Sequence, residues 1–208
     1  MRNLMLVIAL MTASCLLAQE LKPISLPTPQ TDGGRPLMQV LKDRKTTRDF
    51  APDKLPPQIL SNLLWAAFGV NRPDGRRTAP SAMNKQEIDI YVATSDGLFI
   101  YNAQANRLDP VMAQDVRSVT GMQAFAATAP VDLVYVADLS RAGSEPDADL
   151  YTAADTGFIA QNVYLFCASE GLATVVRGSV DRATLAKVIK LRPEQKIILA
   201  QTVGYPKK

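Results

Sequence analysis

The chain has 208 residues, with 23 lysines and arginines against 20 aspartates and glutamates, and a formal net charge of +3. This length suits a single domain, and the near balance of charge excludes the basic footprint of a protein that binds nucleic acid. Because the sequence contains no histidine, it excludes histidine-based catalytic triads, zinc sites with two histidines and imidazole general bases. We expect no metal site.

The first 18 residues have the features of a secretory signal peptide. Arg2 supplies a short basic start, and residues 4–11 form an apolar run that is too short to span a bilayer comfortably. Small residues follow, and we expect cleavage after Ala18 and export, to the periplasm in a bacterium. Cys15 also follows small residues, so a lipoprotein anchored there is the alternative. A membrane is an expected partner only in that case.

The next part of the chain predicts an arm followed by two helices. Residues 19–35 are rich in proline, glycine and polar side chains, which predicts a flexible, extended arm. The remainder, 36–208, is expected to form one domain. Pro36 precedes apolar residues at helical spacing, which predicts a short helix. A second helix is expected from about 57 to 69, where a glycine is the predicted stop.

The middle of the chain predicts loops and strands. Residues 70–85 contain turn-forming residues and no apolar period, so we expect an irregular loop. In residues 87–94, the large aliphatic residues Ile88, Ile90 and Val92 occupy every second position, which predicts a half-buried strand. Residues 97–111 predict a hairpin, and residues 131–139 predict the next strand.

The last part of the chain contains a long helical pattern. Residues 149–170 are apolar on most sides of a helix, which predicts a long central helix that is buried or lies in an interface. Strands are expected at 172–178 and 196–205, on either side of a helix that begins at Asp181 and ends near Lys190. Because helices and strands are interspersed without a regular βαβ rhythm, the pattern predicts an α+β fold with a mainly antiparallel central sheet flanked by helices.

One cysteine lies inside the long helical pattern. Cleavage after Ala18 leaves Cys167 as the only cysteine of the mature chain, so no internal disulfide can form. A free cysteine among apolar residues is usually buried, and we therefore predict a structural thiol and not a redox centre.

The segment RKTTRDF, residues 44–50, places two arginines four residues apart. Arg44 and Arg48 follow a predicted helix end, where guanidinium groups can bind phosphate oxygens through directed hydrogen bonds. Thr46 can add a hydroxyl donor to the same anion. The alternative is that these charges face water and interact favourably with the helix dipole. The segment by itself leaves both interpretations open.

A second candidate site is the loop RRTAPSAMNKQE, residues 76–87. Its proline restricts the backbone, its small residues allow the close approach of a flat ligand, and its amide side chains offer donors and acceptors where a strand begins. An ordinary polar loop is the alternative. The residues concerned are Pro80, Ser81, Ala82, Asn84 and Gln86.

Together, five ordered segments resemble the FMN-dependent nitroreductase family. They are RKTTRDF, LLWAAFG, GRRTAPSAMNKQEIDIYV, GFIAQNVYLFCASEGLATVV and the terminal VGYP, and they run from about residue 37 to the end of the sequence. The third segment is similar to the GRRTAPSAG loop of the branch of thiazole- and oxazole-forming dehydrogenases. The resemblance implies a nitroreductase-like fold with bound FMN. It also implies a homodimer, because family members usually bind FMN at a two-fold interface with residues from both chains.

The resemblance implies roles for residues by their position. The first segment corresponds to the part that holds the FMN phosphate and ribityl chain, and the loop corresponds to the border of the isoalloxazine ring. The strand after the long helix corresponds to backbone N–H groups near flavin N5, and a basic residue after GYP often joins the phosphate site. The implied cofactor-binding residues are Arg44, Lys45, Thr46, Arg48, Pro80, Ser81, Ala82, Asn84, Gln86, Val176, Arg177, Gly178 and Lys207.

The chain departs from the family pattern in two places. NKQEIDIY lacks the apolar residues that commonly face the substrate, and VVRGS is a shortened form of the usual VPIEG. The first departure leaves the substrate open. The second leaves the position of the contact with N5 open by a residue or two.

The function implied is that of an exported FMN-dependent oxidoreductase. Such an enzyme transfers electrons by ping-pong hydride chemistry to a small organic acceptor, here nitroaromatic or quinone-like. The hydride step needs no protein acid or base, which fits a chain without an evident carboxylate pair, so no catalytic residue is assigned. The electron donor is open, because NAD(P)H is scarce outside the cytoplasm. The alternative is a non-catalytic module on the same fold that binds flavin or another small ligand.

Overall fold

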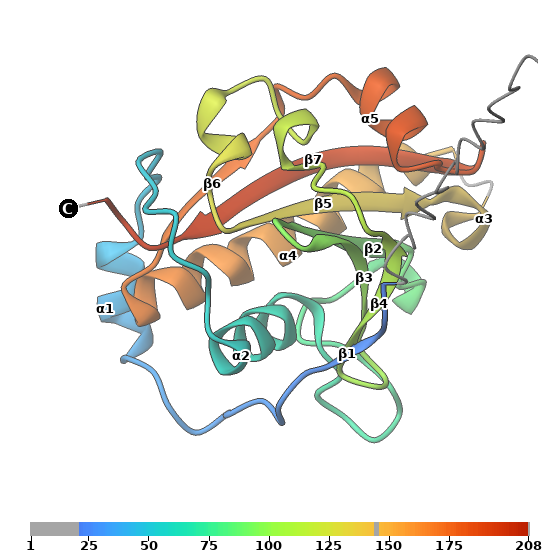
Figure 1. Ribbon diagram of the computed structural model, residues 1–208. Coiled ribbons are helices and arrows are strands. Elements are labelled where there is room, and N and C mark those ends of the chain that lie inside the picture. Colours follow the sequence, from blue (N-terminus) through green and yellow to red (C-terminus); the bar gives the residue numbers. More distant parts are fainter. Residues whose placement is uncertain (1–20, 144–145, 208) are drawn as a thin grey trace, which may run out of the picture.

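The computed structural model describes residues 21–143 and 146–207 (Figure 1). The predicted signal peptide, Cys15 and the first two residues of the predicted arm lie outside this range. No helix within the described ranges combines the length and the apolar character needed to cross a membrane.

The centre of the fold is a seven-stranded antiparallel sheet with the order β1-β4-β3-β2-β5-β7-β6. Chain neighbours β2, β3 and β4 pair as a meander, whereas β5 pairs with β2 on one side and with β7 on the other. The strands are β1 (Ile24–Ser25), β2 (Ile88–Thr94), β3 (Gly97–Asn102), β4 (Arg107–Met112), β5 (Val131–Asp138), β6 (Ala173–Arg177) and β7 (Gln195–Gly204).

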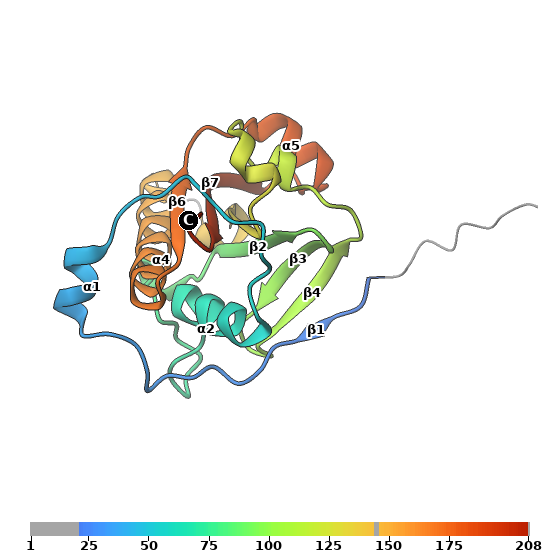
Figure 2. The ribbon, with the colours of Figure 1, turned by 60° about the vertical axis from the view of Figure 1, so that its left-hand side comes forward.

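Helices cover both faces of the sheet (Figures 1 and 2). The long helix α4 and helix α2 pack on one face, and α5 packs on the other. Short 3-10 helices are inserted in the loops. The helices are α1 (Leu37–Asp43), α2 (Pro57–Phe68), α3 (Leu139–Ala142), α4 (Ala148–Glu170) and α5 (Arg182–Val188), with η1 (Ala82–Asn84), η2 (Arg117–Val119) and η3 (Ala124–Ala127).

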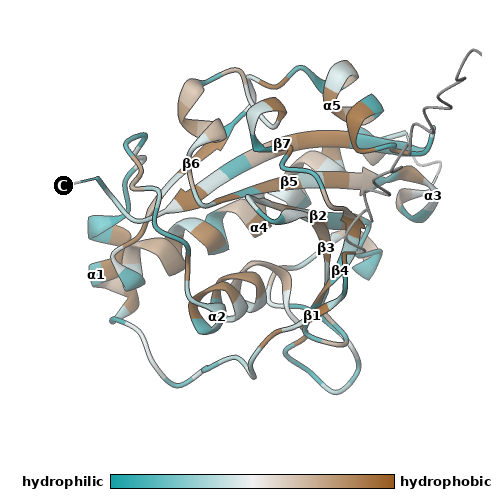
Figure 3. Cartoon of the chain, in the orientation of Figure 1, coloured by the Kyte–Doolittle hydropathy of each residue, from teal (hydrophilic) through white to brown (hydrophobic). Residues whose placement is uncertain are grey.

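The core has two main parts because both faces of the sheet are covered. Even-numbered residues of β2, such as Ile90 and Val92, pack toward α2 and α4, whereas Tyr91 packs toward α5. The central strands β5 and β7 contain apolar stretches that alternate with shorter polar ones (Figure 3). All eight residues of β5 are buried, as expected for a strand covered on both sides.

The architecture confirms the predicted α+β class, the antiparallel sheet and the long helix. Each predicted helix and strand is present within a few residues of its expected bounds. The sequence patterns did not predict β1, α3 or the 3-10 helices. These elements have four residues or fewer, which is too short to display a period.

Residues 21–35, predicted as a flexible arm, are extended but held to the domain (Figure 2). Their strand β1 pairs with β4. The Gln30 N–H donates to Asn62 Oδ1 at 2.9 Å, and the Arg35 N–H donates to Ser169 Oγ at 2.9 Å. The extended course agrees with the prediction, and these hydrogen bonds hold the described part of the arm against the domain. Such contacts leave no pattern in the sequence of the arm itself.

Candidate functional site

The segment 44–48 lies beside β6, the edge strand of the sheet, and next to the C-terminal half of α4. The Thr47 N–H donates to the carbonyl oxygen of Thr174 in β6 at 3.0 Å, which holds the segment against that edge. The Arg44 guanidinium lies over the ring of Tyr164, 5.2 Å from its centroid. The Thr46 hydroxyl is 3.0 Å from the Tyr164 hydroxyl. The segment is therefore ordered by contacts with α4 and β6.

Tyr164 links two parts of the site that the sequence analysis treated separately. Its hydroxyl accepts a hydrogen bond from the Val176 N–H at 3.0 Å, so it can donate its own proton to Thr46. The arginine segment and the end of β6 are thus connected through one side chain. The sequence analysis missed this residue, because a tyrosine in an apolar helix has the same pattern as a packing residue.

A cavity of about 720 Å³ opens beside this segment, and three of the predicted cations line it: Arg44, Lys45 and Lys207. The Lys207 N–H donates to the Asp49 carbonyl oxygen at 3.2 Å, which places the C-terminal segment next to the arginine segment. Arg48 is exposed and does not line this cavity. The structure therefore brings Lys207 to Arg44 but leaves Arg48 outside the wall.

The cations of this cavity are not neutralised by neighbours. Within the described ranges, none of Arg44, Lys45, Arg48 and Lys207 forms a salt bridge. Two acids also line the cavity, Asp43 and Asp49. The Asp43 carboxylate pairs with Arg35, and this hydrogen bond lowers the pKa of Asp43. Asp49 forms no salt bridge with a described residue, so four cations, Lys42 included, face one acid without a counter-ion. Uncompensated cations around a cavity are suited to bind an anion such as a phosphate.

Cys167 is also among the residues that line this cavity. The side chain is fully buried, and burial raises the pKa of its thiol. A thiol of raised pKa stays protonated and is a poor nucleophile, so the predicted buried thiol is confirmed.

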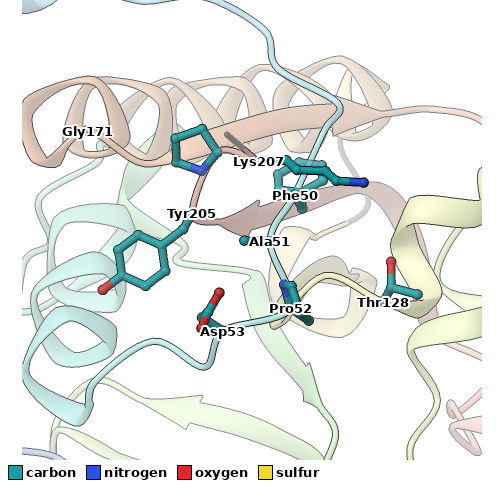
Figure 4. A pocket seen from close by; sticks show the side chains of 9 residues that line it. Phe50, Ala51, Pro52, Asp53, Thr128, Gly171, Tyr205 and Lys207 are labelled. Carbon is teal, nitrogen blue, oxygen red and sulfur yellow. The ribbon is translucent and has the colours of Figure 1, made fainter.

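A second cavity of about 910 Å³ adjoins the first and shares Gly171, Pro206 and Lys207 with it. Figure 4 shows Phe50, Tyr205, Asp53 and Lys207 around this space. A backbone bridge joins Phe50, which lines the second cavity, to Pro206, which lines both. The wall of the second cavity is mostly apolar and aromatic, in contrast to the cationic wall of the first.

The loop 80–86 has an unusual backbone. Met83, Asn84 and Gln86 all have positive φ, at 51°, 54° and 50°. Non-glycine residues in this region cost on the order of 1 kcal/mol each, and they persist only where surrounding contacts hold them. The loop therefore stores strain in the stretch that was predicted to border the flavin ring.

Specific hydrogen bonds hold the strained loop. The Ala82 N–H donates to Asp155 Oδ2 in α4 at 2.8 Å, and the Gln86 N–H donates to Ser81 Oγ at 2.9 Å. The Gln86 Oε1 atom accepts from Arg77 Nε at 2.8 Å. Gln86 and Ser81 thus serve the shape of the loop, whereas Pro80, Asn84 and the Met83 side chain are exposed. Asp155 is a second residue that the sequence analysis missed.

The loop and the arginine segment lie on different flanks of α4. Asp155 contacts the loop and Tyr164 contacts the segment. Nine residues separate these two side chains, which corresponds to about 13.5 Å along the helix and about 180° around it. The exposed side of α4 between the flanks contains the apolar residues Leu150, Tyr151 and Phe158. One chain thus presents two half-sites separated by an apolar helix face.

The end of β6 contributes backbone groups and no free charge. The Val176 N–H is bonded to Tyr164. The Arg177 side chain points to the other face of the sheet, where it forms a salt bridge with Asp132 at 2.8 Å and is almost fully buried. Gly178 is exposed. Of the three predicted residues, Arg177 can therefore face the site only through its backbone.

No group of three or more Cys, Asp or Glu residues in the described part of the chain stands where it could hold a metal ion.

Comparisons with known proteins identify the family of the chain. The nitroreductase family model matches residues 41–205, and the chain therefore belongs to the nitroreductase family. A candidate nitroreductase from Methanocaldococcus jannaschii is 29% identical over 169 residues, which covers 75% of this chain and 85% of that protein. The crystal structure of a candidate nitroreductase from Ralstonia eutropha is 44% identical, with a TM-score of 0.86 and 90% of each chain covered.

A more distant likeness concerns fold alone. A chain in the Escherichia coli microcin synthetase complex, solved with a truncated peptide precursor, is 18% identical with a TM-score of 0.69. The match covers 100% of this chain and 85% of that one. The nitroreductase-like fold predicted from the five segments is thus confirmed.

Proposed function

We propose that the protein is an FMN-dependent oxidoreductase that transfers electrons to a small nitroaromatic or quinone-like acceptor. The observation that supports this most is the cavity lined by Arg44, Lys45 and Lys207, none of which forms a salt bridge within the described residues. Membership of the nitroreductase family supports an oxidoreductase. When bound, FMN would supply the group that accepts and releases a hydride.

The residues present fit FMN by the chemistry of their donors. Arg44 and Lys207 would bind the phosphate. Thr46 does not line the cavity, and its hydroxyl, bonded to Tyr164 of the cavity wall, would add a donor from the side. The small residues Ser81 and Ala82 would let the loop approach a flat ring. Backbone N–H groups near Gly178 would face the ring nitrogen. In a ping-pong order, donor and acceptor would occupy the same face in turn.

We propose a homodimer because the two half-sites do not meet within one chain. The face of α4 between them exposes Leu150, Tyr151 and Phe158, at 64%, 40% and 49% of their surface. A second copy on this face would cover apolar area and lie next to both half-sites. Phe158→Glu is expected to yield monomers in light scattering and to lose FMN, whereas Val111→Glu on β4 stays dimeric. A monomeric wild-type protein that binds FMN would contradict this proposal.

The test of the cofactor assignment is FMN affinity, measured by quenching of flavin fluorescence. Arg44→Ala is expected to weaken binding by about 10- to 100-fold, the usual effect of losing a charged hydrogen bond. Arg48→Ala should have a smaller effect, because Arg48 does not line the cavity. Arg107→Ala is the matched control, since Arg107 is exposed on β4 and pairs with Asp109. Equal affinity of Arg44→Ala and wild type would refute the phosphate assignment.

Turnover separates the enzyme from a flavin-binding module. Holo-protein is reduced with dithionite or NADPH without oxygen, and a nitroaromatic or a quinone is then added. Rapid reoxidation of the flavin is expected for the enzyme. Flavin that stays reduced with every acceptor would identify a binding module.

We also propose export, from the signal-like residues 1–18, which lie outside the described range. Fractionation of bacterial cells is expected to place the mature protein in the periplasm. If the signal peptide is cleaved after Ala18, Cys15→Ser is expected to leave the protein in the soluble periplasmic fraction. If Cys15 is lipidated, the wild type is expected in the membrane fraction and Cys15→Ser should remove it from there.

A further inference from the structure

Glu87 is buried without a hydrogen-bond donor for its carboxylate. The residue follows the strained loop and precedes β2, and only 2% of it is exposed. Neither of its side-chain oxygens receives a hydrogen bond from another described residue. Its backbone is firmly placed, since its carbonyl oxygen accepts from the Asp138 N–H at 2.9 Å and from Arg141 at 3.1 Å. A buried, unpaired carboxylate is costly, so the group must be satisfied in another way.

The neighbour that can satisfy Glu87 is another acid, Asp155 of α4. Asp155 is 3% exposed, and its Oδ2 atom accepts the Ala82 N–H of the loop. The two carboxyl groups lie within reach of a side-chain hydrogen bond. Two ionised carboxylates are both acceptors and cannot bond, whereas a proton on one of them makes it a donor.

The charges around Glu87 favour the protonated form. Burial is the largest effect and raises the pKa of Glu87 above its ordinary value of 4.5. The charge of Asp155 raises it further, whereas the residue's own backbone N–H and the charge of Arg141 lower it. The Arg141 guanidinium is engaged with Asp89 at 2.7 Å. The Lys85 ammonium donates to the Ala142 carbonyl oxygen. Within the described ranges, therefore, no cation is directed at the Glu87 carboxyl group.

We propose that Glu87 is a positioning residue for the flavin loop. As a neutral acid it donates to Asp155, Asp155 holds the Ala82 N–H, and these two hydrogen bonds keep the loop in its strained shape. The inference deepens the proposed function and rests on it, because the loop matters for binding only where it borders the flavin ring.

The proposal has a direct consequence for pH. When Glu87 loses its proton, two like charges face each other and the bond to Asp155 is lost. Asp155 then holds the Ala82 amide less well, and the residues with positive φ can relax. Because the pKa is raised in the folded state, the contribution of Glu87 is complete below about pH 4.5 and declines as the pH rises through the folded pKa.

The first measurement is hydrogen exchange of the Ala82 and Gln86 amides between pH 5 and 9, corrected for intrinsic rates. In the wild type, protection of Ala82 is expected to fall as the pH rises. Glu87→Gln carries a permanent N–H donor, so its protection should stay constant. Glu87→Leu has no donor and should leave Ala82 unprotected at every pH. Glu194→Gln, an exposed acid paired with Arg192, is the control and should follow the wild type.

The second measurement is FMN affinity of the same variants over the same pH range. At pH 8, Glu87→Gln is expected to bind FMN at least about 5-fold more tightly than wild type, in keeping with one recovered hydrogen bond, and the gap should close toward pH 5. Identical pH profiles of wild type and Glu87→Gln in both measurements would overturn the positioning role. If FMN binds to no variant while the exchange pattern holds, the proposed function fails and the positioning role stands.

Discussion

The two sides of the sheet treat a buried acid in opposite ways. On the side of η2, Asp132 accepts hydrogen bonds from Arg177 at 2.8 Å and from Thr120 at 2.9 Å, and it also bonds with Thr202. On the side of α4, Glu87 is equally buried and receives no hydrogen bond from a described residue.

The two acids therefore differ in role: we expect Asp132 to stabilise the fold and Glu87 to hold the loop of the candidate site. The charge of Asp132 is balanced by Arg177 of the same chain. The Arg177 side chain is buried and cannot contact a ligand. The acid next to the loop is balanced only if it holds a proton. Burial raises the pKa of Asp132 to about 6, although the charge of Arg177 lowers it. We expect the first network to matter for folding at neutral pH, where Asp132 is ionised and paired, and the second acid to matter for the shape of one loop within a range of pH.

The largest expected effect is that of Asp132→Ala. This change leaves the Arg177 guanidinium buried without its counter-ion, which costs about 3–5 kcal/mol of stability. Urea unfolding followed by circular dichroism measures the loss, and FMN affinity of the folded fraction should be little changed. A loss below about 1 kcal/mol would remove the structural side of the comparison.

Tyr164→Phe is expected to have an intermediate effect. It removes the acceptor of the Val176 N–H and the partner of the Thr46 hydroxyl, which costs about 1–2 kcal/mol. The phenyl ring that remains can still lie beneath Arg44. Unfolding curves and FMN titration of the same preparation test this, and a variant as stable as wild type would show that the link to β6 contributes little.

A smaller effect with a defined pH dependence is expected for Glu87→Gln. Its free energy of unfolding should exceed that of wild type by about 1 kcal/mol at pH 8, because the amide donates to Asp155 without a proton. The difference should disappear below the ordinary pKa of 4.5, where wild-type Glu87 is protonated in both states. Urea unfolding at pH 4 and pH 8 checks the sign, and a destabilised variant at pH 8 would contradict it.

The smallest effect is expected for Lys54→Ala. Its salt bridge with Asp96 has two exposed partners, at 66% and 62%, so its removal should change stability by less than about 0.5 kcal/mol. Thermal unfolding of this variant beside Asp132→Ala compares an exposed ion pair with a buried one. A loss that approaches that of Asp132→Ala would mean that burial is not what distinguishes the two.

Periodic patterns predicted most of the fold because the elements on both faces of the sheet bury apolar residues at regular spacing. The run of 131–139 and the helical pattern of 149–170 correspond to β5 and α4, which bury apolar residues at regular spacing. The contacts of the arm with Asn62 and Ser169 could not be predicted, since they depend on residues distant in sequence.

The candidate site was predicted only in part, because some of its contacts join residues that are distant in sequence. Arg44, Lys45 and Lys207 were expected together from the resemblance, and they do line one cavity. The side chain of Arg177 could not be placed, because a shift of one residue in a strand moves a side chain to the other face of the sheet. Tyr164 and Asp155 act through hydrogen bonds to partners more than ten residues away, which no local pattern displays.

By itself, the sequence determined the class of fold and the segments that make up the site, because hydrophobic period and short motifs are local properties of a chain. It also excluded histidine chemistry outright. Only the tertiary structure decided that the loop and the arginine segment lie on different flanks of α4. It also decided that Glu87, directly before β2, lies near Asp155 of α4. Such encounters depend on the packing of distant segments, and burial then sets which of those charges is ionised.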